Sequence, residues 1–285
     1  MRVCDYIADT VYKAGAKDVF LVTGGGMMFL TDGLASHPEM NAIPCNHEQA
    51  AAMAAVGYAK YSGFGSAFVT TGCGGTNTVT GVLHAYQDNT PCIFVSGQCA
   101  TNEIVSSAPA PLRQLGMQEA DIVSIVKPIT KYAVTLKNAD SVVFEMEKAL
   151  YIAKEGRPGP VSVDVPIDIQ QAEIDLSVQE HFLIPNANMP FCTEDDLASV
   201  EEEFKKAKRP LIIAGQGIRL SKATDIFKQF IEKNRIPFVY SRLGFDVYPS
   251  DRDFSKGCIG IRRTRAANFP LANADFILVL GSRLT

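Results

Sequence analysis

A carboxylate near the start of an apolar helix is the feature of this sequence that most suggests chemistry. The segment NHEQAAAMAAVGYAK predicts a helix over 47–61. Asn46 is expected to cap this helix with Gln49 at its third position, which places Glu48 in the first turn. Because the helix dipole favours a carboxylate there, helix-start chemistry alone also accounts for Glu48.

The residues that follow Glu48 favour a chemical role. They are Ala50, Ala51, Ala52, Met53, Ala54, Ala55 and Val56. A helix that is apolar all around is expected to be buried on several sides. A carboxyl group beside such a surface is a candidate for proton transfer, although this pattern names no reaction.

Two glycine clusters follow predicted strands. A triple glycine at 24–26 follows DVFLVT (18–23), and GCGGTN follows SAFVTT (66–71). The third position of a G-x-G-x-x-G motif is Phe29, and GCGGTN lacks the Gly-Lys-Ser/Thr ending of a P-loop. A nicotinamide site and nucleotide hydrolysis are therefore disfavoured.

Other reactive side chains carry weaker signals. His47 and His84 each lie alone on a predicted helix, which favours structural or pocket-lining roles, and no metal site is predicted. Cys73 lies in a glycine turn with no paired base, so we interpret it as a small packing residue. The sequence has no CxxC pair, so we expect reduced thiols, mostly in the core. The seven cysteines are Cys4, Cys45, Cys73, Cys92, Cys99, Cys192 and Cys258.

Arginines cluster in GIRRTRAAN, at Arg262, Arg263 and Arg265. Clusters of this kind usually form a solvated face. Because guanidinium groups suit phosphates and carboxylates, contact with a flavin or a nucleotide-sugar is the alternative interpretation.

Composition excludes several classes of protein. With 47% hydrophobic and 20% charged residues among 285, the chain can bury a substantial core. A net charge of −4 gives no electrostatic reason to expect nucleic acid as a partner. No apolar run approaches the roughly 20 residues that span a bilayer, and the first residues do not resemble a signal peptide, so we expect a cytoplasmic protein.

The elements that must position Glu48 and the glycines alternate between helix and strand. This alternation predicts an α/β fold with a parallel sheet and helices on both of its faces. The predicted helices are 3–14, 47–61, 77–87 and 140–154, and the predicted strands are 18–23, 66–71, 91–97 and 159–166.

A second unit follows a change in pattern. Prolines and asparagines in HFLIPNANMPFC indicate a linker at 173–192 between a first domain (1–172) and a second, Rossmann-like α/β domain (193–285). The second domain is expected to be incomplete, because its last strand normally leads into another crossover. Its predicted elements are a helix at 194–207, a strand at 209–215, a helix at 221–234, a strand at 236–241 and a strand in DFILVLGSRLT.

The helix that contains Glu48 resembles the glutamate helix in the pyrimidine-binding domain of thiamine-diphosphate enzymes related to acetolactate synthase. Further similar segments follow in the family's order, and RPLIIAGQGIR and ANADFILVLGSRLT resemble strands of its central domain, so the resemblance covers 1–285. These segments are FLVTGGGMMFLTDGL (20–34), TTGCGGTNTVTGVLHAYQDNTPCIFVSGQ (70–98), MQEADIVSIVKPITKYA (117–133) and GRPGPVSVDVPIDIQ (156–170).

The resemblance implies a role for each matching residue. Glu48 would hydrogen-bond a pyrimidine ring nitrogen and promote the imino tautomer that takes the proton from C2 of the thiazolium. The residues expected to line or shape the pyrimidine side are Gly24, Gly25, Gly72 and Asn77. Gln118 would face the reaction centre. The family's Phe-Gln-Glu reads Met-Gln-Glu here, and this departure leaves the pocket shape open.

The implied activity is decarboxylation of a 2-oxo acid, pyruvate, and addition of the product to a second carbonyl. The acceptor would be another 2-oxo acid or a keto-sugar. The implied cofactors are thiamine diphosphate and Mg²⁺, with FAD as a further candidate in the central domain.

No GDG segment with a downstream Asn-Asn occurs, so the domain that holds the diphosphate through Mg²⁺ is expected to be absent and the chain to be inactive alone. Because the family's cofactor lies between subunits, we expect a dimer or tetramer, with itself or with a chain that carries the diphosphate domain. The alternative is a noncatalytic or split-enzyme partner that supplies only the pyrimidine-binding half.

Overall fold

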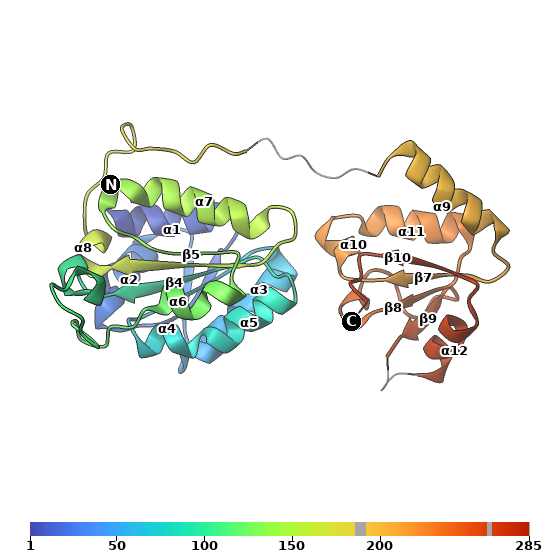
Figure 1. The fold of residues 1–285 in the computed structure, drawn as a ribbon, viewed down its shortest axis with the longest axis horizontal. Helices are drawn as coiled ribbons and strands as arrows, with labels where there is room; N and C mark the ends of the chain where they lie inside the picture. Colours follow the sequence, from blue (N-terminus) through green and yellow to red (C-terminus); the bar gives the residue numbers. More distant parts are fainter. Residues whose placement is uncertain (186–191, 261–263, 285) are drawn as a thin grey trace. The chain divides into compact units, whose positions relative to one another are not determined.

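The chain folds into two compact units, Met1–Asn188 and Met189–Thr285, each with its own sheet (Figure 1). The computed structural model describes residues 1–185, 192–260 and 264–284. In each unit the strands are parallel and helices accompany the sheet, so the predicted α/β fold is confirmed. The predicted linker falls partly outside the described residues, and the domain bounds predicted from the sequence stay predictions.

The first unit is built on a parallel sheet with the strand order β2-β1-β3-β4-β6-β5. Its central strands carry nearly continuous apolar runs, and every residue of β3, β4 and β6 is buried, as expected for strands covered on both faces. The strands are β1 (Asp18–Val22), β2 (Asn41–Pro44), β3 (Gly65–Val69), β4 (Cys92–Gln98), β5 (Tyr132–Thr135) and β6 (Pro160–Pro166).

Helices cover both faces of this sheet (Figure 1). On one face lie α1 (Val3–Lys13), α2 (Met28–Ser36), α7 (Val142–Lys154) and α8 (Ile167–Gln170). On the other lie α3 (Glu48–Ser62), α4 (Cys73–Asn77), α5 (Val79–Gln87) and α6 (Ile122–Val126). Short 3₁₀ turns are η1 (Gly25–Met27), η2 (Thr101–Glu103), η3 (Val105–Ser107), η4 (Lys127–Ile129) and η5 (Ala139–Ser141).

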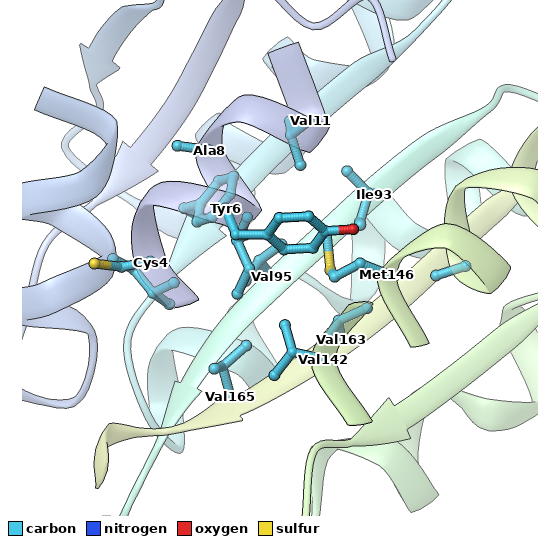
Figure 2. Packing of buried hydrophobic residues seen from close by; sticks show 14 of the residues in the cluster. Cys4, Tyr6, Ala8, Val11, Ile93, Val95, Val142, Met146, Val163 and Val165 are labelled. Carbon is cyan, nitrogen blue, oxygen red and sulfur yellow. The ribbon is translucent and has the colours of Figure 1, made fainter. Parts of the chain in front are cut away.

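The larger apolar core lies between the sheet and the layer of α1 and α7. In α1, Val3, Ile7 and Val11 repeat at helical spacing and are fully buried. Figure 2 shows their neighbours, with Tyr6 of α1 and Met146 of α7 over the side chains of β4 and β6. Burial of each large apolar side chain stabilises the fold by about 1.5–3 kcal/mol.

The order of the strands places a topological switch point between β1 and β3. From β1 the chain passes through α2 to β2 on one side, whereas from β3 it passes through α4 and α5 to β4 on the other. Because α2 and α5 lie on opposite faces, the loops after β1 and β3 diverge at the carboxyl edge. Ligands of open α/β sheets bind in the crevice at such a point.

The second unit contains a smaller parallel sheet of order β10-β7-β8-β9. Its strands are β7 (Pro210–Ala214), β8 (Phe238–Tyr240), β9 (Ser255–Cys258) and β10 (Phe276–Leu280). Its helices are α9 (Glu194–Lys206), α10 (Gly217–Leu220), α11 (Thr224–Asn234) and α12 (Arg265–Asn273), and η6 (Arg242–Gly244) is a 3₁₀ turn. Phe227, Ile231 and Phe238 are central to its core.

The sequence did not predict the short edge strands β2, β5 and β9. Each has only four residues, and none is buried along its whole length. Edge strands are covered on fewer sides than central strands, so they need fewer apolar residues, and β2 also ends in a proline. Four residues are too few to show the apolar alternation by which a strand is recognised in a sequence. The helices α2, α6 and α12 were also not predicted.

Among the described ranges, the structure contains no helix with the length and apolar character that crossing a bilayer requires.

Helices α3 and α5 pack closely because Gly81 has no side chain. A methyl group on Gly81 would lie 2.5 Å from Cβ of Ala52, far inside normal contact distance. Since α5 follows α4 after one residue, this contact also sets how near the end of α4 lies to α3.

We predict that Gly81→Ala lowers the free energy of unfolding by about 1–3 kcal/mol, because overpacking outweighs the gain in helix propensity. Gly57→Ala is the matched control within α3, since nothing lies within 4 Å of the added methyl. It should raise stability by about 0.5–1 kcal/mol. Urea unfolding of both variants measures the difference, and equal effects would contradict the packing argument.

Candidate functional site

The predicted site residues lie in loops and helix ends that follow four neighbouring strands. The strands β2, β1, β3 and β4 are adjacent and parallel, so their carboxyl ends share one edge of the sheet. Gly24 and Gly25 follow β1, Glu48 follows β2, Gly72 and Asn77 follow β3, and Gln118 lies in the segment after β4.

Glu48 is the first residue of α3 and is half-buried. Its Oε2 accepts a hydrogen bond from Nδ2 of Asn77 at 2.9 Å, which joins two of the predicted residues. Within the described part of the chain, Oε1 has no hydrogen-bond partner. The carboxyl group is therefore held by one oxygen and presents the other.

The predicted cap of α3 was wrong by one residue. His47, not Asn46, is the N-cap, and its Nδ1 accepts from the backbone N–H of Gln49 at 3.1 Å. The backbone of His47 is extended, which brings its ring to the open amide of the first turn. The expected burial of α3 on several sides also differs, because Ala50 and Met53 are exposed.

The glycine turn after β1 packs closely on the side chain of Thr70, which follows β3. A Cβ on Gly24 would lie 2.6 Å from Thr70, and the N–H of Gly26 donates to Oγ1 of Thr70 at 3.2 Å. Gly25 differs, since no protein atom lies within 4 Å of the place of its missing Cβ. Beside this turn, Oγ1 of Thr71 is buried without a hydrogen-bond partner among the described residues.

Gly72 and Gln118 are brought into direct contact. Gly72 has φ +62° and ψ −106°, and a Cβ there would lie 1.9 Å from the carbonyl oxygen of Gln118. Only glycine adopts this backbone without strain and leaves room for the second loop. Gln118 itself has a positive φ of +60°, and its side chain is exposed.

Gln170 positions the glycine turn, and sequence reasoning did not identify it. The side chain is fully buried, and Nε2 donates to the carbonyls of Gly26 and Val165, each at 2.8 Å. Oε1 accepts from the N–H of Leu30 at 3.4 Å. A polar residue after the apolar run of β6 was the only sequence signal.

Asp164 is the second buried polar residue that the sequence did not reveal. Its carboxyl group accepts from Oγ of Ser96 at 2.6 Å, Nε2 of Gln98 at 2.9 Å and Oγ1 of Thr135 at 3.2 Å. Burial is the largest effect and raises its pKa to about 7, and the negative charge of Asp121 acts in the same direction. The three donors oppose this rise.

His84 and Cys73 are the other reactive side chains that the sequence analysis considered. His84 lies 3.0 Å from the Asp88 carboxylate, which also binds Lys60 at 2.6 Å, so its role is structural. Cys73 is exposed at the start of α4, so its interpretation as a packing residue was wrong. The turn before α4 directs this first residue outward.

The remaining cysteines also differ from expectation. All seven are free thiols, but only Cys4, Cys92 and Cys99 are buried, so most are not core residues. Cysteines that end loops or short strands lie at the surface. In the ranges that the structure describes, no group of three or more His, Cys, Asp or Glu side chains could hold a metal ion.

Arg265 is exposed at the start of α12, whereas Arg262 and Arg263 lie outside the described residues.

Comparison with known proteins shows the family of the chain. Residues 1–125 match the model of the thiamine pyrophosphate enzyme N-terminal TPP binding domain, and residues 197–285 match the model of the central domain. The chain belongs to the thiamine pyrophosphate enzyme family. The two models correspond to its two units.

Similar members of the thiamine pyrophosphate enzyme family are acetolactate synthase large subunits. The chain is 36% identical to that of Lactococcus lactis over 97% of its own length and 47% of the relative. It is 33% identical to a probable large subunit of Methanocaldococcus jannaschii over 100% of the chain and 48% of the relative. The chain thus spans about half the length of the curated relatives it matches.

We predict that the stability of the first unit falls as pH rises from about 4 to about 7. Native Asp164 has a pKa of about 7, above the value of about 3.9 for an unfolded chain, so the folded state binds more protons in this range. The contribution of Asp164 to the free energy of unfolding is therefore complete below about pH 4 and is lost as the pH rises through about 7. In Asp164→Asn this dependence should disappear, so the variant gains about 2–4 kcal/mol relative to the parent across this range.

Asp175→Asn is the control for this measurement. The pKa of Asp175 is lowered by hydrogen bonds from Ser177, so its stabilising contribution is lost only as pH falls below the usual carboxyl range. Urea unfolding between pH 4 and 8 measures each variant. The same pH profile for Asp164→Asn and the parent would contradict the prediction.

Proposed function

We propose that this chain supplies the pyrimidine-binding half of the active site in a thiamine-diphosphate-dependent enzyme that decarboxylates a 2-oxo acid. Pyruvate is the proposed donor, and the product adds to a second carbonyl compound, either a 2-oxo acid or a keto-sugar. The hydrogen bond between Glu48 and Asn77 beside the glycine turns carries this proposal. The acetolactate synthase large subunits among its relatives support it.

The residues at the carboxyl edge fit the pyrimidine end of the cofactor. Gly25 leaves open space beside the turn, and Thr71 offers a buried hydroxyl without a partner among the described residues. A flat ring needs such space and edge hydrogen bonds. When bound, thiamine diphosphate supplies the nucleophilic carbon that attacks the 2-oxo acid.

Glu48 would hold a proton between Oε1 and the ring nitrogen of the pyrimidine. The side-chain amide of Asn77 donates to Oε2, so the carboxyl group cannot rotate freely. The start of α3 adds a favourable dipole for the ionised form. A positioned carboxyl group of this kind exchanges a proton without reorganising.

Gln118 would contact the reacting centre from the opposite loop. Its side chain is exposed, and its backbone rests on Gly72, which follows the strand next to the glycine turn. Met117 precedes it and is 85% exposed. We propose that Met117 helps to set the shape of the acceptor pocket.

The diphosphate and Mg²⁺ would be bound by a different domain, in a second copy of the complete protein or in another chain. The outer side of α3 and α5 carries exposed apolar residues at Ala50, Met53, Leu83 and Tyr86. We propose that a dimer or tetramer covers this surface. FAD in the central domain and a cytoplasmic location are further proposals, and an absorbance spectrum of the purified protein tests the flavin.

We predict that Glu48→Gln slows exchange of the C2 proton of bound thiamine diphosphate by about 10²- to 10⁴-fold, because glutamine cannot pass a proton to the ring. The measurement is hydrogen–deuterium exchange of the bound cofactor, followed by NMR after acid quench in the complete enzyme.

Glu194→Gln is a matched control. Glu194 is the first residue of α9, as Glu48 is of α3, so both changes remove a charge from the first turn of a helix. The control should leave exchange unchanged. Unchanged exchange in Glu48→Gln would show that the carboxyl group does not activate the cofactor.

We predict that a polypeptide of residues 1–285 does not turn over pyruvate with thiamine diphosphate and Mg²⁺, because these residues include no GDG segment. Carbon dioxide release measures turnover. If a separate polypeptide with a diphosphate-binding domain restores it, the split-enzyme alternative is correct. Turnover by residues 1–285 alone would contradict the proposed division of the site.

A further inference from the structure

The segment 99–121, between β4 and α6, is held in place although it contains only short 3₁₀ turns (Figure 1). Loops of this length without regular secondary structure are usually functional. Gln118 lies near its end, so the contacts of the segment determine where Gln118 is placed.

The carboxylate of Glu119 links distant parts of this segment by hydrogen bonds. It accepts hydrogen bonds from the backbone N–H groups of Val105 at 2.6 Å, Leu115 at 3.0 Å and Gly116 at 3.3 Å. One side chain therefore joins the η3 turn to the residues just before Gln118. Hydrogen bonds to an ionised acceptor are the strong class.

The same stretch is tied to the sheet on its other side. Nε2 of Gln98, which also donates to buried Asp164, donates to the carbonyl of Ala120 at 3.0 Å. Sγ of Cys99 donates to the carbonyl of Met117 at 3.2 Å, and burial raises the pKa of this thiol, which keeps the donor proton in place.

Gln118 is the exception among these residues. Its backbone has φ +60°, and its carbonyl rests on Gly72. Within the described ranges its exposed side chain has no hydrogen-bond partner. The residues on both sides are fixed while the amide is left free, an arrangement that prepares a side chain to contact another molecule.

We propose that Glu119 is a positioning residue, whose carboxylate holds the amide of Gln118 at the edge where the cofactor binds. This inference rests on the proposed function for the role of Gln118. The contacts of Glu119 themselves are independent of that role.

The first test is hydrogen exchange of the backbone amides in the complete enzyme. In Glu119→Gln one acceptor oxygen becomes an NH₂ group that faces N–H donors. Either the amide of Val105, which bonds to Oε1, or the amides of Leu115 and Gly116, which bond to Oε2, should therefore exchange at least about tenfold faster. Glu103→Gln is the matched control, because Glu103 lies in the same segment and its carboxylate accepts no hydrogen bond from the described residues.

The second test is a double-mutant cycle on pyruvate turnover. Gln118→Ala and Glu119→Gln should each lower kcat/KM by about 10- to 100-fold, because misplacement of a contacting group by about 1 Å is enough. If Glu119 acts through Gln118, the double variant should be no slower than Gln118→Ala alone.

The two tests separate this inference from the proposed function. Unchanged amide exchange in Glu119→Gln, or additive losses in the cycle, would overturn the positioning role while Glu48 keeps its own test. Unchanged turnover in Gln118→Ala would overturn the role of Gln118 and this inference with it. Faster exchange in Glu119→Gln together with non-additive losses is the expected result.

Discussion

Close packing against glycines at the carboxyl edge of the first sheet is the constraint on which the candidate site depends. Gly24 packs on Thr70, and Gly72 packs on the carbonyl of Gln118. Side chains at these positions would separate the loops that follow β1, β3 and β4. Because interiors pack densely, a single added methyl group would move a whole loop. The glycines thus bring polar groups from distant parts of the chain to one edge.

Buried polar side chains then hold these loops in place. Gln170 fixes the turn at Gly26, and Asp164 with Gln98 reaches the segment before α6. Such groups are costly to bury unless they are hydrogen-bonded, and here the side chains bond to the loops that they support. The loops are held by buried hydrogen bonds, whereas Oε1 of Glu48 and the side-chain amide of Gln118 have no hydrogen-bond partner among the described residues. A site for a cofactor needs this combination of fixed loops and available polar groups.

Under the proposed function, these residues form one half of a site that another domain would complete. In that proposal Glu48 would exchange the proton and the glycine turns would leave space for the ring. The exposed apolar side of α3 and α5 agrees with this division, because a helix that is apolar on all sides needs a second cover.

The sequence by itself determined the α/β class, the central strands and the residues of the candidate site. Long apolar runs such as β4 and β6 and the helical repeat of Val3, Ile7 and Val11 are local signals, and the ordered family segments identify Glu48. Only the tertiary structure decided that Glu48 bonds to Asn77, that His47 caps α3, and that Asp164, Gln170 and Glu119 support the loops. The contacts of Glu48 and Gln170 join loops whose proximity depends on strand order, and Glu48 follows the short edge strand β2, whose four residues carry no periodic pattern. The contacts of His47 and Glu119 are local, but they depend on backbone conformations that the sequence pattern does not specify.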